Sequence, residues 1–133
     1  MPLVVKIVLF LGTITCISAS VDVSIRQRYC NSQSIDQNSD ADTAITEVLH
    51  DVIDRTSSSP RYDVVSKKEH GSATFWAEGI CGYGMTSNDC YICKTMAWFY
   101  LDEDCRLKAG GRITLAACKL RYETYRFDLD GRW

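Results

Sequence analysis

The cysteines constrain this fold more than any other feature of the sequence. The 133-residue chain contains seven cysteines, and three of them fall within thirteen residues, Cys81–Cys93, in the pattern C-x8-C-x2-C. Cys16 lies in an apolar N-terminal run, and without that run six remain: Cys30, Cys81, Cys90, Cys93, Cys105 and Cys118. Six cysteines in a small exported domain normally form three disulfides, but their number and spacing leave the pairing open.

Residues 1–20 have the plan of a secretory signal peptide. A lysine precedes an apolar run over Ile7–Ile17, and Ser18 and Ser20 occupy the −3 and −1 positions of a cleavage site. The run is shorter than the roughly 20 apolar residues that span a bilayer. We therefore predict a signal peptide over 1–20 and one secreted domain over 21–133, with no membrane span in the mature protein.

The charge balance argues against a nucleic-acid-binding or lipid-binding protein. Residues 1–20 hold one Lys and no acidic residue, so the rest of the chain carries 14 Lys and Arg against 17 Asp and Glu. A chain with this balance has no broad electrostatic attraction to phosphate groups.

The hydrophobic pattern predicts an α+β domain. From Asp42, apolar residues recur at spacings of three and four, which indicates a helix capped by Asp40 or Asp42 and ended by the Ser57–Pro60 run. Thr86 followed by Asp89 has the form of a capping box for a second helix over 88–102. The apolar stripe of the first helix comprises Ala44, Ile45, Val48, Leu49, Val52 and Ile53.

Strands are expected around these helices. Alternation or β-branched and aromatic content indicates them over Val21–Arg28, Tyr62–Ser66 and Ala73–Ile80. Arg112–Tyr125 is also strand-like throughout. One straight strand from Arg112 to Glu123 would separate these two residues by about 36 Å, so a site using both requires a reversal near Ala116–Lys119.

Catalytic and metal-binding alternatives find little support. Cys90 and Cys93 form half of a zinc ligand set, but the second pair is missing, and His50 and His70 lie far apart. A redox CxxC at a helix start is the other alternative, yet Cys81 lies close by as a competing partner. No hydrolase motif occurs. We therefore predict structural disulfides, no metal, no cofactor and no enzymatic activity.

The cysteine pattern resembles that of the ginkbilobin-like family of secreted, cysteine-rich plant domains. Cys81, Cys90 and Cys93 match its C-x8-C-x2-C motif, and Cys30 followed by Asn31 matches its opening motif. The segment GGRITLAACKLRYETYRF is similar to the family's C-terminal segment, and the likeness covers essentially all of 21–133. The resemblance implies two helices on a five-stranded antiparallel sheet, with disulfides Cys30–Cys105, Cys81–Cys90 and Cys93–Cys118.

The same resemblance implies a mannose-binding, antifungal lectin of plant defence. The family's sugar-binding residues correspond here to Asn31, Arg112 and Glu123. Arg offers only donors, Glu only acceptors and Asn both, so the three together can satisfy adjacent sugar hydroxyls. A single carboxylate is not the acid–base pair of a glycosidase, so binding without turnover is expected. The expected partner is fungal cell-surface mannan in the apoplast.

The sequence leaves two alternatives open. Arg112 and Glu123 can form an ordinary cross-strand ion pair, and Asn31 can simply satisfy the backbone in a turn. At the level of function, the chain can instead be an apoplastic interaction or signalling module that binds a protein partner.

Overall fold

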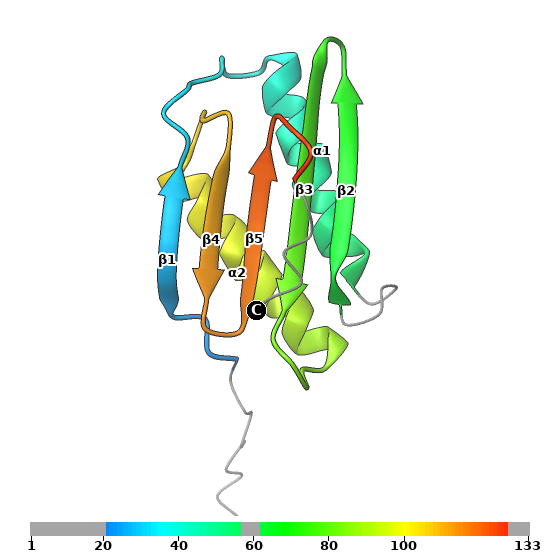
Figure 1. Cartoon of the computed structure of the whole chain (residues 1–133), viewed down its shortest axis with the longest axis vertical. Coiled ribbons are helices and arrows are strands. Elements are labelled where there is room, and N and C mark those ends of the chain that lie inside the picture. Colours follow the sequence, from blue (N-terminus) through cyan, green and yellow to red (C-terminus); the bar gives the residue numbers. More distant parts are fainter. Residues whose placement is uncertain (1–20, 57–61, 128–133) are drawn as a thin grey trace, which may run out of the picture.

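A five-stranded antiparallel sheet with two helices on one face forms the fold (Figure 1). The computed structural model describes residues 21–56 and 62–127, so the predicted signal peptide and the Ser57–Pro60 helix stop lie outside the described residues. The elements are β1 (Ile25–Cys30), α1 (Asp40–Asp54), β2 (Val64–His70), β3 (Ala73–Cys81), α2 (Ser87–Asp104), β4 (Gly111–Leu115) and β5 (Cys118–Glu123). The predicted α+β architecture is confirmed.

The C-terminal hairpin lies in the middle of the sheet. The strand order is β1-β4-β5-β3-β2, and every neighbouring pair is antiparallel. The expected chain reversal occurs at Ala116 and Ala117, after which Leu120 pairs with Ile113. This reversal brings Arg112 and Glu123 to the same end of neighbouring strands.

Both helices bury their apolar sides against one face of the sheet. On α1 the buried residues Ala44, Val48, Leu49, Val52 and Ile53 all come from the predicted stripe, and Ile45 is partly buried. On α2 the buried residues are Cys90, Cys93, Lys94, Ala97 and Leu101. The opposite face, which we call the open face, carries no helix (Figure 1).

The helix caps differ in part from the prediction. Ser39, rather than Asp40 or Asp42, is the N-cap of α1, and its hydroxyl accepts from the Asp42 N–H at 3.3 Å. The two carboxylates lie in the first turn instead, where the helix dipole favours negative charge. Thr86 caps α2 as predicted and accepts from the Asp89 N–H at 3.1 Å.

The boundaries of β1 and β2 also differ from the prediction, because pairing partners set them. β1 begins at Ile25 rather than Val21 and continues to Cys30, which pairs with Gly111. β2 runs from Val64 to His70 instead of ending at Ser66, since its partner β3 continues to pair with it as far as His70.

Three disulfides join the helices to the sheet. Cys30–Cys105 links the end of β1 to the end of α2. Cys81–Cys90 links the end of β3 to the first turn of α2, and Cys93–Cys118 links α2 to the start of β5. These are the pairs that the family resemblance implies. No helix among the described residues is long and apolar enough to cross a membrane.

Candidate functional site

The open face of the sheet carries two of the three predicted sugar-binding residues. Side chains alternate between the two faces of a strand. On β4 the buried Ile113 points to the helices and the exposed Arg112 lies on the open face. On β5 Tyr122 points to the helices, so its neighbour Glu123 also lies on the open face.

Gly110 connects the three predicted residues. The Asn31 backbone N–H donates to the Gly110 carbonyl at 2.9 Å. A Cβ placed on Gly110 would lie 2.5 Å from the Glu123 carboxylate oxygen Oε2. Arg112 follows Gly110 by two residues and therefore lies on the same side of β4. The structure thus brings Asn31, Arg112 and Glu123 together at one end of three adjacent strands, β1, β4 and β5.

Glu123 is a buried acceptor with a fixed partner. Its side chain is almost fully buried, and its Oε1 accepts from Arg121 Nε at 3.2 Å. Arg121 is itself held, because its Nη2 donates to the Tyr125 hydroxyl at 3.2 Å and its guanidinium lies 4.3 Å from the Phe127 ring. The alternative in which Arg112 and Glu123 form the ion pair is wrong; the pairing residue is Arg121.

Arg112 keeps its hydrogen-bond donors available. Its guanidinium lies 5.2 Å from the centroid of the Tyr29 ring, in a cation–π contact that leaves the N–H edge unused. Within residues 21–56 and 62–127 it makes no hydrogen bond or ion pair. Tyr29 therefore supports the guanidinium without consuming its donors.

Asn31 uses only one side of its amide. Its Oδ1 accepts from the Gln33 N–H at 2.8 Å, which closes a local Asx-type turn after β1. The turn interpretation of Asn31 is therefore correct for the oxygen. The two N–H donors of the amide remain for a ligand.

The structure also places Arg112 in a hollow with charged residues that the sequence did not mark as site residues. A hollow of about 180 Å³ on the open face is lined by Arg112 and, among others, by Gln27, Glu78, Lys119 and Arg121. Neither Asn31 nor Glu123 lines it. The alternation of Lys119, Arg121 and Glu123 along β5 was the signal that places these three side chains on one face.

A methyl group at Gly110 should disturb the Glu123 carboxylate. We expect Gly110→Ala to lower the free energy of unfolding by about 1–3 kcal/mol, because the added Cβ overlaps Oε2 and also approaches the Tyr122 carbonyl at 3.3 Å. Urea denaturation of Gly110→Ala, Glu123→Ala and the double variant measures the coupling. Strictly additive losses in the double variant would show that Gly110 does not act on Glu123.

The described part of the chain holds no candidate metal centre. No group of three or more His, Cys, Asp or Glu side chains in residues 21–56 and 62–127 is placed to hold an ion. The six cysteines there are all in disulfides, so none of them presents a thiol.

Comparison with known proteins gives a family and a fold. The family model described as salt stress response/antifungal matches residues 29–125. Cysteine-rich repeat secretory protein 21 of Arabidopsis thaliana is 27% identical over 84 residues, which cover 61% of this chain and 33% of that protein.

Solved structures that share the fold include the tandem DUF26 ectodomains of the Arabidopsis thaliana cysteine-rich receptor-like proteins PDLP5 and PDLP8. Their TM-scores are 0.70 and 0.72, with 17% and 20% identity over 78% of this chain. The chain spans 51% and 50% of these ectodomains and a third of the curated relative.

Proposed function

Because the chain belongs to the salt stress response/antifungal family, we propose that it is a secreted antifungal lectin that binds fungal cell-surface mannan without turnover. The proposed site consists of Asn31, Arg112 and Glu123. The observation that carries the proposal is their convergence around Gly110 at one end of the open face.

The three side chains offer complementary hydrogen bonding. The Arg112 guanidinium, which lies over the Tyr29 ring, offers N–H donors. The Asn31 amide offers two more N–H donors. Glu123 is the acceptor, and its contact with Arg121 holds the carboxylate in place before a ligand arrives. A pre-positioned charged acceptor beside donors is suited to vicinal sugar hydroxyls, since each hydroxyl both donates and accepts.

The disulfides support the proposal of secretion. Disulfides persist in oxidising compartments and are rare in the cytosol. With three of them among about a hundred described residues, the fold suits an extracellular environment. The curated relative is named as a secretory protein, which agrees with this location.

We expect weak binding of free mannose and stronger binding of the polymer. A small polar site of this kind should have a Kd near about 1 mM for the monosaccharide. Display of many mannose units on one polymer raises the effective affinity without any new contact.

Alanine substitution at Arg112 or Glu123 should strongly reduce retention on immobilised mannan. We expect Arg112→Ala and Glu123→Ala each to weaken binding by about tenfold to a hundredfold, because each removes a charge-assisted hydrogen bond. Asn31→Ala should have a smaller effect, since part of the Asn31 amide serves the local turn. Arg26→Ala is the matched control, because Arg26 is an exposed arginine of β1 that, within residues 21–56 and 62–127, pairs with Asp22 and lies outside the proposed site.

The outcome also tests the signalling alternative. Retention of mannan binding in both Arg112→Ala and Glu123→Ala, with disulfides intact, would show that the site assignment is wrong. If activity on hyphae persists in excess mannose, the chain acts instead through a protein partner, as the fold it shares with receptor-like ectodomains allows.

A further inference from the structure

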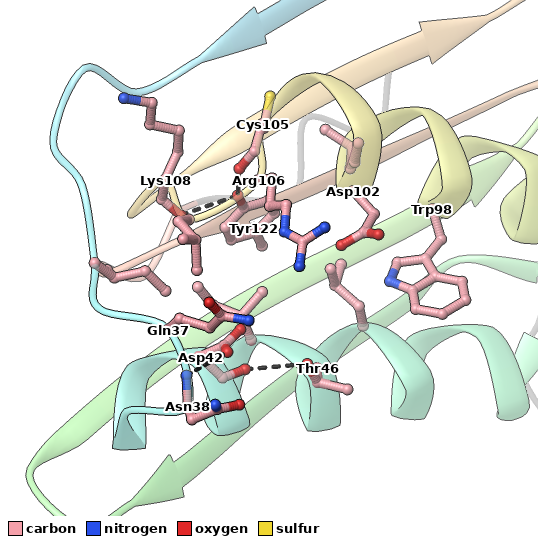
Figure 2. A pocket seen from close by; sticks show the side chains of 15 residues that line it. Gln37, Asn38, Asp42, Thr46, Trp98, Asp102, Cys105, Arg106, Lys108 and Tyr122 are labelled. Carbon is pink, nitrogen blue, oxygen red and sulfur yellow. Dashed lines mark hydrogen bonds between the residues drawn. The ribbon is translucent and has the colours of Figure 1, made fainter.

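A second concavity lies on the helix side of the molecule, away from the open face. It has a volume of about 260 Å³ and lies between α1, α2, the segment after β1 and the segment before β4 (Figure 2). We call it the helix-side cavity. Asn31, Arg112 and Glu123 do not line it. Its principal polar lining residues are Gln37, Asp42, Thr46, Trp98, Asp102 and Arg106.

The two loops that form one wall of the cavity are joined by backbone hydrogen bonds. The Ile35 N–H donates to the Leu107 carbonyl at 2.9 Å, and the Ala109 N–H donates to the Gln33 carbonyl at 2.8 Å. Two lining residues, Asn38 and Leu107, adopt positive φ angles of 58° and 56°. Leucine rarely adopts this conformation, so the surrounding structure holds the wall in its shape.

The floor of the cavity is closed. Leu49 and Leu101 are buried there, and the Tyr122 hydroxyl lies 3.0 Å from the Lys108 carbonyl and 3.3 Å from the Cys105 carbonyl. Burial, with the nearby Glu123 and Asp102 charges, holds the pKa of Tyr122 well above its usual value. The hydroxyl is therefore protonated and donates to backbone carbonyls. Hydrogen bonds to a ligand must come from the residues that form the walls of the cavity.

Four polar groups at the walls have unused hydrogen-bonding capacity. Figure 2 shows the Asp102 carboxylate, the Arg106 guanidinium, the Gln37 amide and the Trp98 indole directed toward the space between the helices. None of these side chains makes a hydrogen bond or ion pair with any other described residue. Asp102 accepts, Arg106 and the indole N–H donate, and Gln37 does both.

The charge pattern of the lining selects against several ligand classes. An apolar ligand would leave a carboxylate and a guanidinium desolvated without partners, which is costly. An anion would meet Asp42 and Asp102, and a cation would meet Arg106 and Lys108. A neutral polyhydroxylated ligand can hydrogen-bond to both the negatively and the positively charged lining residues, because each hydroxyl can donate to a carboxylate or accept from a guanidinium.

We infer that the helix-side cavity is a second carbohydrate-binding site, which takes a single sugar ring. Its volume is below the roughly 300–1,000 Å³ of pockets for drug-sized ligands, so it suits a compact ligand. Asp102 accepts from one sugar hydroxyl, and Arg106 and the Trp98 indole N–H donate to others. The Trp98 ring is positioned by a T-shaped contact with His50, with ring centroids 5.0 Å apart and ring planes at 83°. This site does not depend on the proposed site at Gly110.

Titration of a protein that lacks the open-face site tests the inference. The disulfide-bonded Arg112→Ala variant is titrated with mannose, glucose and N-acetylglucosamine, and the Trp98 indole N–H is followed by NMR. We expect a saturable shift with at least one sugar. Asp102→Asn in the same background should weaken that binding by about tenfold, because it removes the charged acceptor. Glu103→Gln is the matched control, since Glu103 is an exposed neighbour on α2 outside the cavity, and it should leave the titration unchanged.

Three results would overturn the inference. The first is an indole signal that stays in place up to about 50 mM of every sugar. The second is an Asp102→Asn titration identical to that of the Glu103→Gln control. The third is a response to a zwitterionic amino acid such as leucine and to none of the sugars. Mannan retention by Arg112→Ala is scored separately, so failure at Gly110 and failure in the helix-side cavity are distinguishable.

Discussion

Removal of the Cys30–Cys105 disulfide by a Cys30→Ala/Cys105→Ala double substitution should remove a large part of the stability of the protein. This bond closes a loop of 75 residues, and the chain-entropy model assigns such a loop about 4 kcal/mol of stability. A domain of this size has roughly 5–15 kcal/mol in total. The bond also ties β1, an exposed edge strand, to the end of α2.

The Cys81–Cys90 disulfide provides the matched comparison. It closes a sequence separation of only 9 residues, so Cys81→Ala/Cys90→Ala should lose about 2–3 kcal/mol. Urea denaturation gives both values from the midpoint and slope. Mannan binding should also weaken more in the Cys30→Ala/Cys105→Ala variant than in the Cys81→Ala/Cys90→Ala variant, since Asn31 directly follows Cys30. An equal or larger stability loss in the Cys81→Ala/Cys90→Ala variant would contradict the prediction.

The stability of the protein should rise between pH 8 and pH 10 because of Lys94. This lysine is fully buried between α2 and the sheet, and its Nζ donates to the Tyr62 carbonyl at 2.7 Å. Burial lowers its pKa from 10.5 to about 8, although the nearby Asp63 and Glu78 charges act in the opposite direction. In this pH range the unfolded chain therefore binds more protons at Lys94 than the folded chain does.

The sign of the effect follows from proton linkage. Stability increases with pH wherever the unfolded state holds more protons, so the penalty for burying the Lys94 charge disappears as pH rises from about 8 to 10.5. The full effect is on the order of 3 kcal/mol. Tyr122 acts in the opposite sense above about pH 10, because its raised pKa keeps it neutral in the fold while the unfolded tyrosine ionises. We expect a stability maximum near about pH 10.

Lys94→Met identifies the source of this pH dependence. Methionine has a similar length and no titrating group, so the variant should lose the rise between pH 8 and pH 10 while keeping the decline that Tyr122 causes. Urea denaturation at pH 7, 8, 9, 10 and 11 measures both proteins. If Lys94→Met shows the same rise as the parent, the titrating group lies elsewhere.

Much of the fold could be predicted because its signals are local. The period of the apolar residues from Ala44 to Ile53 defines the buried side of α1, and Thr86 with Asp89 marks the start of α2. The need for a reversal between Arg112 and Glu123 follows from the length of an extended chain. The cysteine register led, through the family resemblance, to the disulfide pairs that the structure contains.

Other features depended on register and packing between distant segments. Arg112 and Arg121 are equivalent candidates for pairing with Glu123 in the sequence, and only the position of each side chain shows that Arg121 makes the contact. Lys94 is a charged residue whose type favours the surface, yet it is buried because its side chain lies against Gly79 of β3, next to Val52 of α1. The spacing of polar and apolar residues in the sequence reveals neither the partner of Glu123 nor the burial of Lys94.

The sequence by itself determined the elements, the family and the three residue types proposed to bind sugar. Only the tertiary structure decided that Gly110 joins Asn31 to Glu123, and that four separate segments enclose the helix-side cavity. The physical reason is that helix and strand periods reflect interactions between residues a few positions apart. A binding site made from side chains more than sixty residues apart exists only after the strands have paired and the helices have packed.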